Sequence, residues 1–442
     1  MAQLGYNNTM NFLGKLNSIP DGLLEFASPV SFSIEHYATY ENHPTLITLN
    51  VIVLHEANQI YTLISQDELP AGIDAQNLEN LVMVANKIGQ EVICLTEPLE
   101  LETVNIPKPW GQEIWYSGIE QRGISTVKGL PLPWLLHVFG DYLGCAGAPL
   151  LLKILDPFPD TNLGDLYFEM HEKKTEVYVV TQIDLNAWPS GFGKIRYGFN
   201  QDLLNTFGSP KNFTDSYRLS VAEYQAIRIK IDARINSLKK KKGFITKDPL
   251  TPDEYNQFLG QIEAELILKE EKLRKKMYSY TAMHDLKVGD VVTVAPMVPH
   301  SLQHGVRVVE FQTPHYERHI LSFGQEVLTQ DHWDTEKALQ KAITQDIASQ
   351  EPEEIARGKD LIANFNAFKV IRLRLNPGES DFIERNNYKI LIGVIGEITL
   401  NNSTKIHAEK AFFLASNSTI HLNNSGSAPA IVLIAEENHS PL

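Results

Sequence analysis

The sequence has few cysteines, a deficit of positive charge and no long hydrophobic run. Cys94 and Cys145 are its only cysteines, too few for a disulfide framework or a thiolate zinc site. Lys and Arg number 39 against 54 Asp and Glu, and the net charge of -15 disfavours non-specific binding to nucleic acid or anionic lipid. The start of the chain lacks a basic segment followed by an apolar one. We therefore expect a cytoplasmic protein that binds neither nucleic acid nor membrane.

The length and the spacing of apolar residues predict several domains that are rich in β-structure. A chain of 442 residues is too long for one ordinary core and corresponds to about two to four domains. Short β-branched and aromatic segments alternate with turns from Phe32 to Ser65, and helical spacing begins at Asp74 and ends near Gly89. We interpret residues 1–106 as an N-terminal β-rich region with one helix.

The period of the apolar residues changes to that of a helix after about residue 218. Ser220 and Thr251 are each followed three residues later by Glu, which is the pattern of a capping box. We predict a helical hairpin over 218–277, in which the four lysines from Lys239 to Lys242 favour the helix macrodipole rather than a polyanion site. A polar helix is expected from Asp334, and residues 360–442 read as a separate, small antiparallel β domain.

One short segment, LYFEMHEKKTEVYVV, carries three potential metal ligands. Because side chains alternate along a strand, Glu169 and His171 point the same way, and a turn over 172–175 would let Glu176 face them from the next strand of a hairpin. His300, at the end of the strand GDVVTVA, could supply a fourth ligand. Imidazole and carboxylate together suit zinc, manganese or iron. The same residues are also a common solvent-side assortment, so spacing alone leaves both interpretations open.

Several segments resemble type I phosphomannose isomerase, a family of the cupin superfamily, and they occur in that family's order. PKPWGQEIW, PLLLKILD, Lys174-Thr175-Glu176 followed by VYVV, and VGDVVTVAPMVPH each match a family motif. The resemblance spans roughly residues 107 to 322. It implies a mainly β fold with a helical insertion, in a jelly-roll, bicupin-like architecture. The metal-binding cupin domain would comprise 107–217 and 278–345, and the domain over 360–442 would be cupin-like.

The resemblance also implies a role for each matching residue. It places the metal on four ligands, Glu169, His171, Glu176 and His300, with zinc the first choice and manganese or iron possible. Lys174 would line the substrate site. The segment GVRVVEFQTPHYER places an acidic residue at Glu310 and an arginine at Arg318 near the sugar. The spacing there is about two residues shorter than in the family.

The implied activity is the interconversion of mannose 6-phosphate and fructose 6-phosphate through an enediolate, with a small sugar phosphate as substrate and an oligomeric state that stays open. Two departures matter: Glu169 replaces a neutral glutamine of the family, and Met297 replaces a turn glycine. The long loop between the first two motifs is also missing. Two alternatives therefore stay open, namely a cupin isomerase or epimerase for another sugar, and a non-catalytic sugar-binding cupin.

Overall fold

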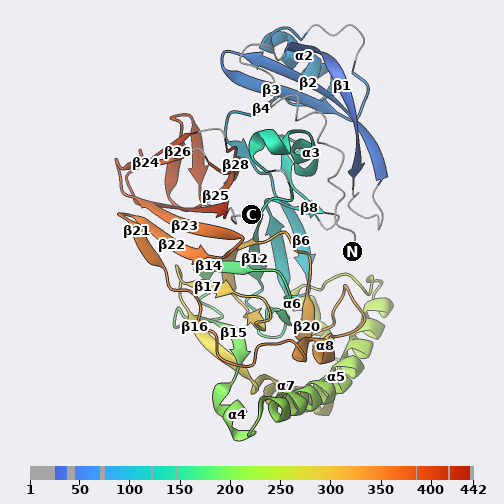
Figure 1. Cartoon of the computed structure of the whole chain (residues 1–442). Coiled ribbons are helices and arrows are strands. Elements are labelled where there is room, and N and C mark those ends of the chain that lie inside the picture. Colours follow the sequence, from blue (N-terminus) through green and yellow to red (C-terminus); the bar gives the residue numbers. More distant parts are fainter. Residues whose placement is uncertain are drawn as a thin grey trace. The chain divides into compact units, whose positions relative to one another are not determined.

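The structure is a computed structural model and describes residues 25–36, 45–69, 75–120, 123–145, 147–384, 386–416 and 419–438 (Figure 1). The chain divides into two compact units. Unit 1 comprises Met1–Asn105, Trp115–Leu152 and Glu351–Leu442, and unit 2 comprises Ile106–Ile114 and Lys153–Gln350. This division is coarser than the four regions expected from the sequence, and the boundaries of those regions stay predictions.

Unit 2 is built around two antiparallel sheets whose inner faces share one apolar core. The six-stranded sheet has the order β17-β14-β19-β12-β7-β6, with bounds Val291–Val294, Glu176–Ile183, Val306–Gln312, Leu151–Pro157, Gly111–Trp115 and Val104–Lys108. The five-stranded sheet has the order β16-β15-β18-β13-β20, with bounds Thr281–Leu286, Gly193–Phe199, His300–Leu302, Phe168–Met170 and His319–Ser322. Two sheets of short strands around one core are typical of a jelly roll, so the expected mainly β fold is confirmed.

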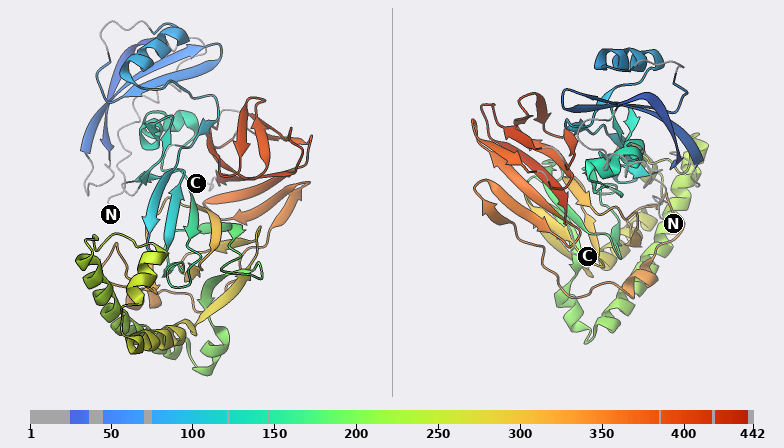
Figure 2. Two further views of the ribbon diagram at one scale, coloured as in Figure 1. Left: turned by 180° about the vertical axis from the view of Figure 1, so that it is seen from behind. Right: turned by 45° about the horizontal axis from the view of Figure 1, so that its top comes forward.

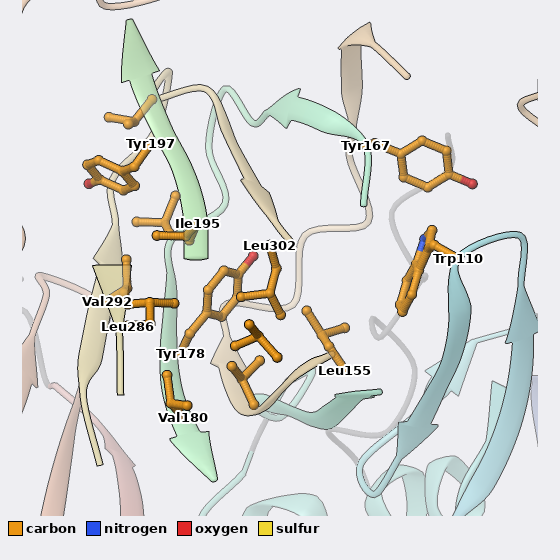
Figure 3. Packing of buried hydrophobic residues seen from close by; sticks show 14 of the residues in the cluster. Trp110, Leu155, Tyr167, Tyr178, Val180, Ile195, Tyr197, Leu286, Val292 and Leu302 are labelled. Carbon is orange, nitrogen blue, oxygen red and sulfur yellow. The ribbon is translucent and has the colours of Figure 1, made fainter. Parts of the chain in front are cut away.

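The inner positions of these strands change from apolar to polar along the strand direction. From the end of β14 back to its start, the inward residues are Val180, Tyr178 and Glu176. Their direct partners on β19 are, in the same order, Val308, Glu310 and Gln312. The apolar end belongs to a core that includes Leu302 of β18 and Ile195 of β15 (Figure 3). Since opposite residues of an antiparallel pair share a face, the polar side chains of several strands collect at one end of the core.

Helices cover the outer face of the five-stranded sheet. They are α4 Gln201–Thr206, α5 Pro210–Lys241, α7 Ala264–Tyr278 and α8 Thr335–Leu339, while α6 Pro252–Leu259 packs on the C-terminal half of α5. Phe168 and Met170, which flank Glu169 and therefore point outward, pack with Tyr217 and Tyr224 of α5 and with Met277 of α7. Figure 1 shows α5 and α7 running side by side. The helical insertion thereby fixes the strand that carries Glu169.

Four expectations about the helices are corrected by the structure. Ser220 lies in the middle of α5, which begins at Pro210 with Ser209 as its N-cap. The second helix is broken into α6 and α7, and the helix expected from Asp334 is only the five-residue α8. Lys239 is buried and donates to the carbonyl oxygens of Thr246 and Asp248 at 2.8 and 2.5 Å, so it joins a loop to the helix end instead of facing solvent.

Unit 1 contains a second pair of packed sheets. The larger one has the order β21-β22-β23-β30-β25-β28-β5, with bounds Glu353–Ala356, Lys359–Asn364, Phe368–Leu375, Ala430–Glu437, Lys389–Ile395, Ala411–Leu414 and Leu99–Glu100. The smaller has the order β24-β29-β26-β27, with bounds Ser380–Ile383, Ile420–Asn423, Glu397–Leu400 and Thr404–His407. Alternate residues, such as Val432 and Ile434 of β30, fill the space between them. Figure 2 shows these strands, in orange and red, as two layers.

The rest of unit 1 contains a four-stranded sheet, a helix and short ribbons. Strands β1 to β4 are Glu25–His36, Thr45–Glu56, Gln59–Ser65 and Ile93–Cys94, and α2 (Leu78–Ile88) packs on this sheet and ends at Gly89. The expected start of this helix, Asp74, lies outside the described residues. Two ribbons, β8 with β9 (Ile119–Glu120, Gly123–Ile124) and β10 with β11 (Thr126–Val127, Leu130–Pro131), precede α3 (Leu132–Leu143). Among the described helices, none is both long and apolar enough to cross a membrane.

The two predicted capping boxes give a matched test of the helical insertion. Thr251 accepts a hydrogen bond from the N–H of Glu254, whose carboxylate accepts one from the N–H of Thr251. We expect Thr251→Ala to lower the free energy of unfolding by about 1 kcal/mol. Ser220→Ala should not lower it, because the Ser220 hydroxyl is buried without a hydrogen-bond partner. Urea unfolding followed by circular dichroism measures both, and an equal loss in the two variants would contradict the assignment.

Candidate functional site

The four predicted metal ligands come from three strands and one turn at the polar end of unit 2. Glu169 is the middle residue of β13, His171 follows that strand, Glu176 opens β14 and His300 opens β18. The expected hairpin is wrong, because β13 and β14 belong to different sheets. His300 also does not end the strand GDVVTVA: β17 stops at Val294 and β18 lies in the other sheet. The ligands converge because the two sheets face each other across the core.

The side-chain atoms of these residues meet in one small volume. Glu169 and His300 are direct partners across the β13–β18 pair. One ligand atom each from Glu169, His171 and His300 lies within 4.8 Å of the others. Glu176 is not part of this group of three, but its two oxygens lie 3.4 Å from Nε2 of His171 and 3.1 Å from Nε2 of His300. The structure therefore brings all four predicted ligands together.

Both histidines point Nε2 toward this volume. Nδ1 of His171 lies 2.8 Å from the carbonyl oxygen of Glu317, and Nδ1 of His300 lies 3.0 Å from that of Val298. A carbonyl oxygen can only accept, so each Nδ1 carries a proton and Nε2 is the ring nitrogen that faces the other predicted ligands. Burial, with Lys174 nearby, holds the pKa of His171 well below its usual value. An uncharged imidazole is the form of His171 that a metal ligand needs.

Glu176 is a buried carboxylate held in its charged form. Burial alone would raise the pKa of Glu176, but its neighbours, Lys174 first among them, outweigh burial and hold the pKa well below its usual range. The Nζ of Lys174 forms an ion pair with Oε1 of Glu176, and the hydroxyl of Tyr178 donates to Oε2 at 2.9 Å. A carboxylate fixed in this way fits a divalent cation, as do the Nε2 atoms of both histidines and Oε2 of Glu169, which have no hydrogen-bond partner.

A buried row of alternating charges lies beside these ligands. Lys153 of β12 lies 3.4 Å from Glu113 and 3.3 Å from Glu310, and Lys108 lies 2.8 Å from Glu113. Burial, reinforced by Glu176 and opposed by Lys153, raises the pKa of Glu310 to about 8. The carboxyl group of Glu310 can therefore hold a proton at neutral pH and release it at a slightly higher pH.

Arg318 reaches the same end from the segment before β20. Its guanidinium lies over the ring of Tyr167, 4.6 Å from the centroid, and its Nε is 3.8 Å from Oε2 of Glu169. One further nitrogen of Arg318 donates to the hydroxyl of Thr329 at 2.7 Å. The predicted residues Lys174, Glu310 and Arg318 thus each contact a charged residue of this site.

The turn between Glu169 and Glu176 is held by Glu317, which the sequence does not single out, and by Met297. The carboxylate of Glu317 accepts hydrogen bonds from the N–H groups of Lys173 and Lys174, the latter at 2.8 Å. Met297 adopts a left-handed φ of 65° and donates its N–H to the carbonyl oxygen of His171 at 2.6 Å. Left-handed φ favours glycine, so Met297 holds this position at a cost in strain.

Other polar residues of the site were also missed by sequence reasoning. Lys153, Glu113 and Lys108 lie within the segments PLLLKILD and PKPWGQEIW, so the resemblance pointed to the right strands without naming these side chains. Tyr178 could have been found by its spacing, since it lies two residues after Glu176 and shares its face.

Two further histidines, His304 and His319, and two tryptophans, Trp110 and Trp115, have environments of their own. His304 contacts Asp165 at 2.7 Å and stacks on Trp188, and His319 contacts Glu172 at 3.1 Å. Trp110 is buried in the core of unit 2, and Trp115 is buried in unit 1. The geometry gives core packing as the environment of both tryptophans.

Comparison with known proteins adds evidence on the fold. No family model and no curated protein matches the sequence. Among solved structures, mannose 6-phosphate isomerase from Bacillus subtilis is 14% identical, covers 77% of this chain and 99% of its own, and has a TM-score of 0.51. A mutant phosphomannose isomerase from Salmonella typhimurium is 10% identical, with 77% and 100% covered and a TM-score of 0.52. A mannose 6-phosphate isomerase bound with zinc and yttrium is 11% identical, with the same coverage and a TM-score of 0.53.

These likenesses extend over almost the whole length of the solved structures, far beyond the segments that carry the sequence motifs. At 10–14% identity they show that the chain shares the fold of these isomerases. The ligand set, the reaction and the substrate rest on the residues of this chain.

The hydroxyl of Tyr178 provides a test of metal binding that leaves all four ligands in place. Tyr178→Phe removes the hydrogen bond to Glu176, and the loss of such a supporting contact costs about 10- to 100-fold in metal affinity. Tyr197→Phe is the matched control, because the Tyr197 hydroxyl donates to the carbonyl oxygen of Thr293 in the same core. Zinc affinity measured by competition with a chromophoric chelator should fall only in Tyr178→Phe. Equal affinities in the two variants would argue against a metal on Glu176.

Proposed function

We propose that the protein is a metal-dependent aldose–ketose isomerase of the phosphomannose isomerase type, interconverting mannose 6-phosphate and fructose 6-phosphate or a related sugar phosphate. The observation that carries this proposal is the convergence of Glu169, His171, Glu176 and His300, with the Nε2 atoms of both histidines directed at the carboxylate of Glu176. These four residues would hold the metal. A zinc ion suits two imidazoles and two carboxylates, and manganese or iron is an alternative.

The chemistry asks the protein to move one proton between C1 and C2 of the sugar and to stabilise the enediolate that forms between the two transfers. A divalent metal supplies a fixed positive charge for a sugar or water oxygen. Glu310 would take the proton from C2 and return it to C1, for which a pKa of about 8 is well placed. Lys174 and Arg318 would offset the negative charge of the enediolate or of a phosphate group.

The charge balance of the site favours a second candidate, an uncharged sugar. Each of four cations contacts a carboxylate: Lys108 and Lys153 both contact Glu113, Lys174 contacts Glu176 and Arg318 contacts Glu169. The departure at Glu169, which adds the carboxylate beside Arg318, is what completes this balance. A site whose cations are already paired has less to offer a phosphate dianion than one with a free cation.

The direct test loads the purified protein with zinc or manganese and follows mannose 6-phosphate, fructose 6-phosphate and the corresponding free sugars by NMR in deuterated water. Interconversion with deuterium entering at C1 or C2 is the expected result. Turnover of free sugars alone would select the second candidate. The absence of both turnover and bound metal would reject an isomerase and favour a non-catalytic sugar-binding cupin.

Replacement of Glu310 tests the proton transfer separately from the metal. Glu310→Gln should lower kcat about 10²- to 10⁴-fold, the range of a lost general acid or base, while the metal content stays unchanged. Glu270→Gln is the control, because Glu270 is also buried but pairs with Tyr224 and Arg274 among the helices. A loss of deuterium incorporation only in Glu310→Gln would assign the transfer to this residue, whereas undiminished incorporation would exclude it.

A further inference from the structure

Gln312 carries a buried hydrogen-bond acceptor that the protein leaves unused. It is the last residue of β19, and only 2% of it is exposed. Its Nε2 donates to the carbonyl oxygen of Thr313 at 3.2 Å, whereas its Oε1 is buried and has no hydrogen-bond partner in the part of the chain that the structure describes. An unpaired buried acceptor is costly, and most buried polar groups in folded proteins have a partner. A group that arrives with a ligand would provide the missing donor.

The strand register places this acceptor in the candidate site. Gln312 is the direct partner of Glu176 across the β14–β19 pair, and it lies two residues from Glu310 on the same strand. Opposite residues of a pair and alternate residues of a strand share a face. The amide of Gln312 therefore lies on the inward face beside a proposed metal ligand and the proposed proton shuttle.

The chemistry of Gln312 differs from that of its neighbours. Glu176 is engaged by Lys174 and by the Tyr178 hydroxyl, and Glu310 by Lys153. Gln312 is neutral, so its oxygen neither repels a carboxylate nor needs a cation to offset it. The donor that suits such an oxygen in a charge-balanced site is a neutral O–H group. Glu310 adds a second such atom, since its Oε1 is buried and has no hydrogen-bond partner among the residues that the structure describes, so a ligand with several hydroxyl groups would satisfy more than one of these atoms.

We propose that Gln312 is a specificity-determining residue, whose Oε1 accepts a hydrogen bond from one hydroxyl group of a polyhydroxylated substrate. This inference rests on the proposed function, because it assumes that the bound sugar is a substrate, but it concerns recognition of the sugar and not the chemical step. The ligand would be a sugar or sugar phosphate that has a hydroxyl group at the ring or chain position facing β19. An analogue that lacks this hydroxyl would leave Oε1 unpaired and be rejected.

The test compares Gln312→Met, which keeps the length of the side chain but removes the amide, with the parent protein and with Gln303→Met. Gln303 has the same 2% exposure, but its Nε2 donates to the carbonyl and hydroxyl oxygens of Ser301. Substrate KM should rise about 10- to 100-fold in Gln312→Met only. A series of monodeoxy sugars should show one position at which the parent protein discriminates and Gln312→Met does not.

Binding of alditols and alditol phosphates to the metal-loaded protein, measured by calorimetry, separates this inference from the proposed function. Weaker alditol binding by Gln312→Met in a protein that turns over no sugar would reject the isomerase and support the recognition role. Turnover with unchanged KM and an unchanged deoxy-sugar profile would overturn the role of Gln312 alone. A loss of metal from Gln312→Met would also overturn it, because the residue would then act on the metal site.

Discussion

The contact of one buried carboxylate, Glu176, with two imidazole rings is the interaction on which the rest of the site depends. Its oxygens lie 3.4 and 3.1 Å from Nε2 of His171 and His300, and a bare carboxylate at this depth would be very costly without opposing charge. Lys174 and the Tyr178 hydroxyl keep it charged in the absence of an ion. The protein thus maintains a preformed set of ligands, because the barrel fixes every partner of this one group.

The core between the two sheets of unit 2 has an apolar end and a polar end. Valine, leucine and isoleucine fill one end of the shared core, while the same strands present carboxylates, lysines and an amide at the other end. Side-chain alternation makes this possible, since one strand can supply an apolar residue and, two positions further, a functional one. The helices pack on the outer face of the sheet that carries Glu169 and His300, which explains why a polar site can sit in a short-stranded sheet without loosening it.

Alternating charge is the second organising feature of the site. Lys108, Glu113, Lys153 and Glu310 form a continuous row in which each charge faces an opposite one, and the pKa of Glu310 still lies near 8 because burial outweighs its lysine partner. Such a row sets the protonation state of a group near the reaction without exposing it to solvent. Arg318 and Glu169 form a similar pair of opposite charges at the five-stranded sheet. This pair bears on whether the proposed substrate carries a phosphate.

The sequence by itself determined the β-rich class, the helical insertion and the capping box at Thr251, which follow from local rules, namely the period of apolar residues and cap chemistry. Ligand spacing indicated the four predicted metal ligands, and the family resemblance added Lys174, Glu310 and Arg318. Tertiary structure alone decided that Glu169 and Glu176 lie on opposite sheets, that Ser220 is internal to a long helix, and that Lys153 and Gln312 join the site. The physical reason is that strand pairing joins residues more than a hundred positions apart, as with Glu169 and His300, and no local pattern encodes that register.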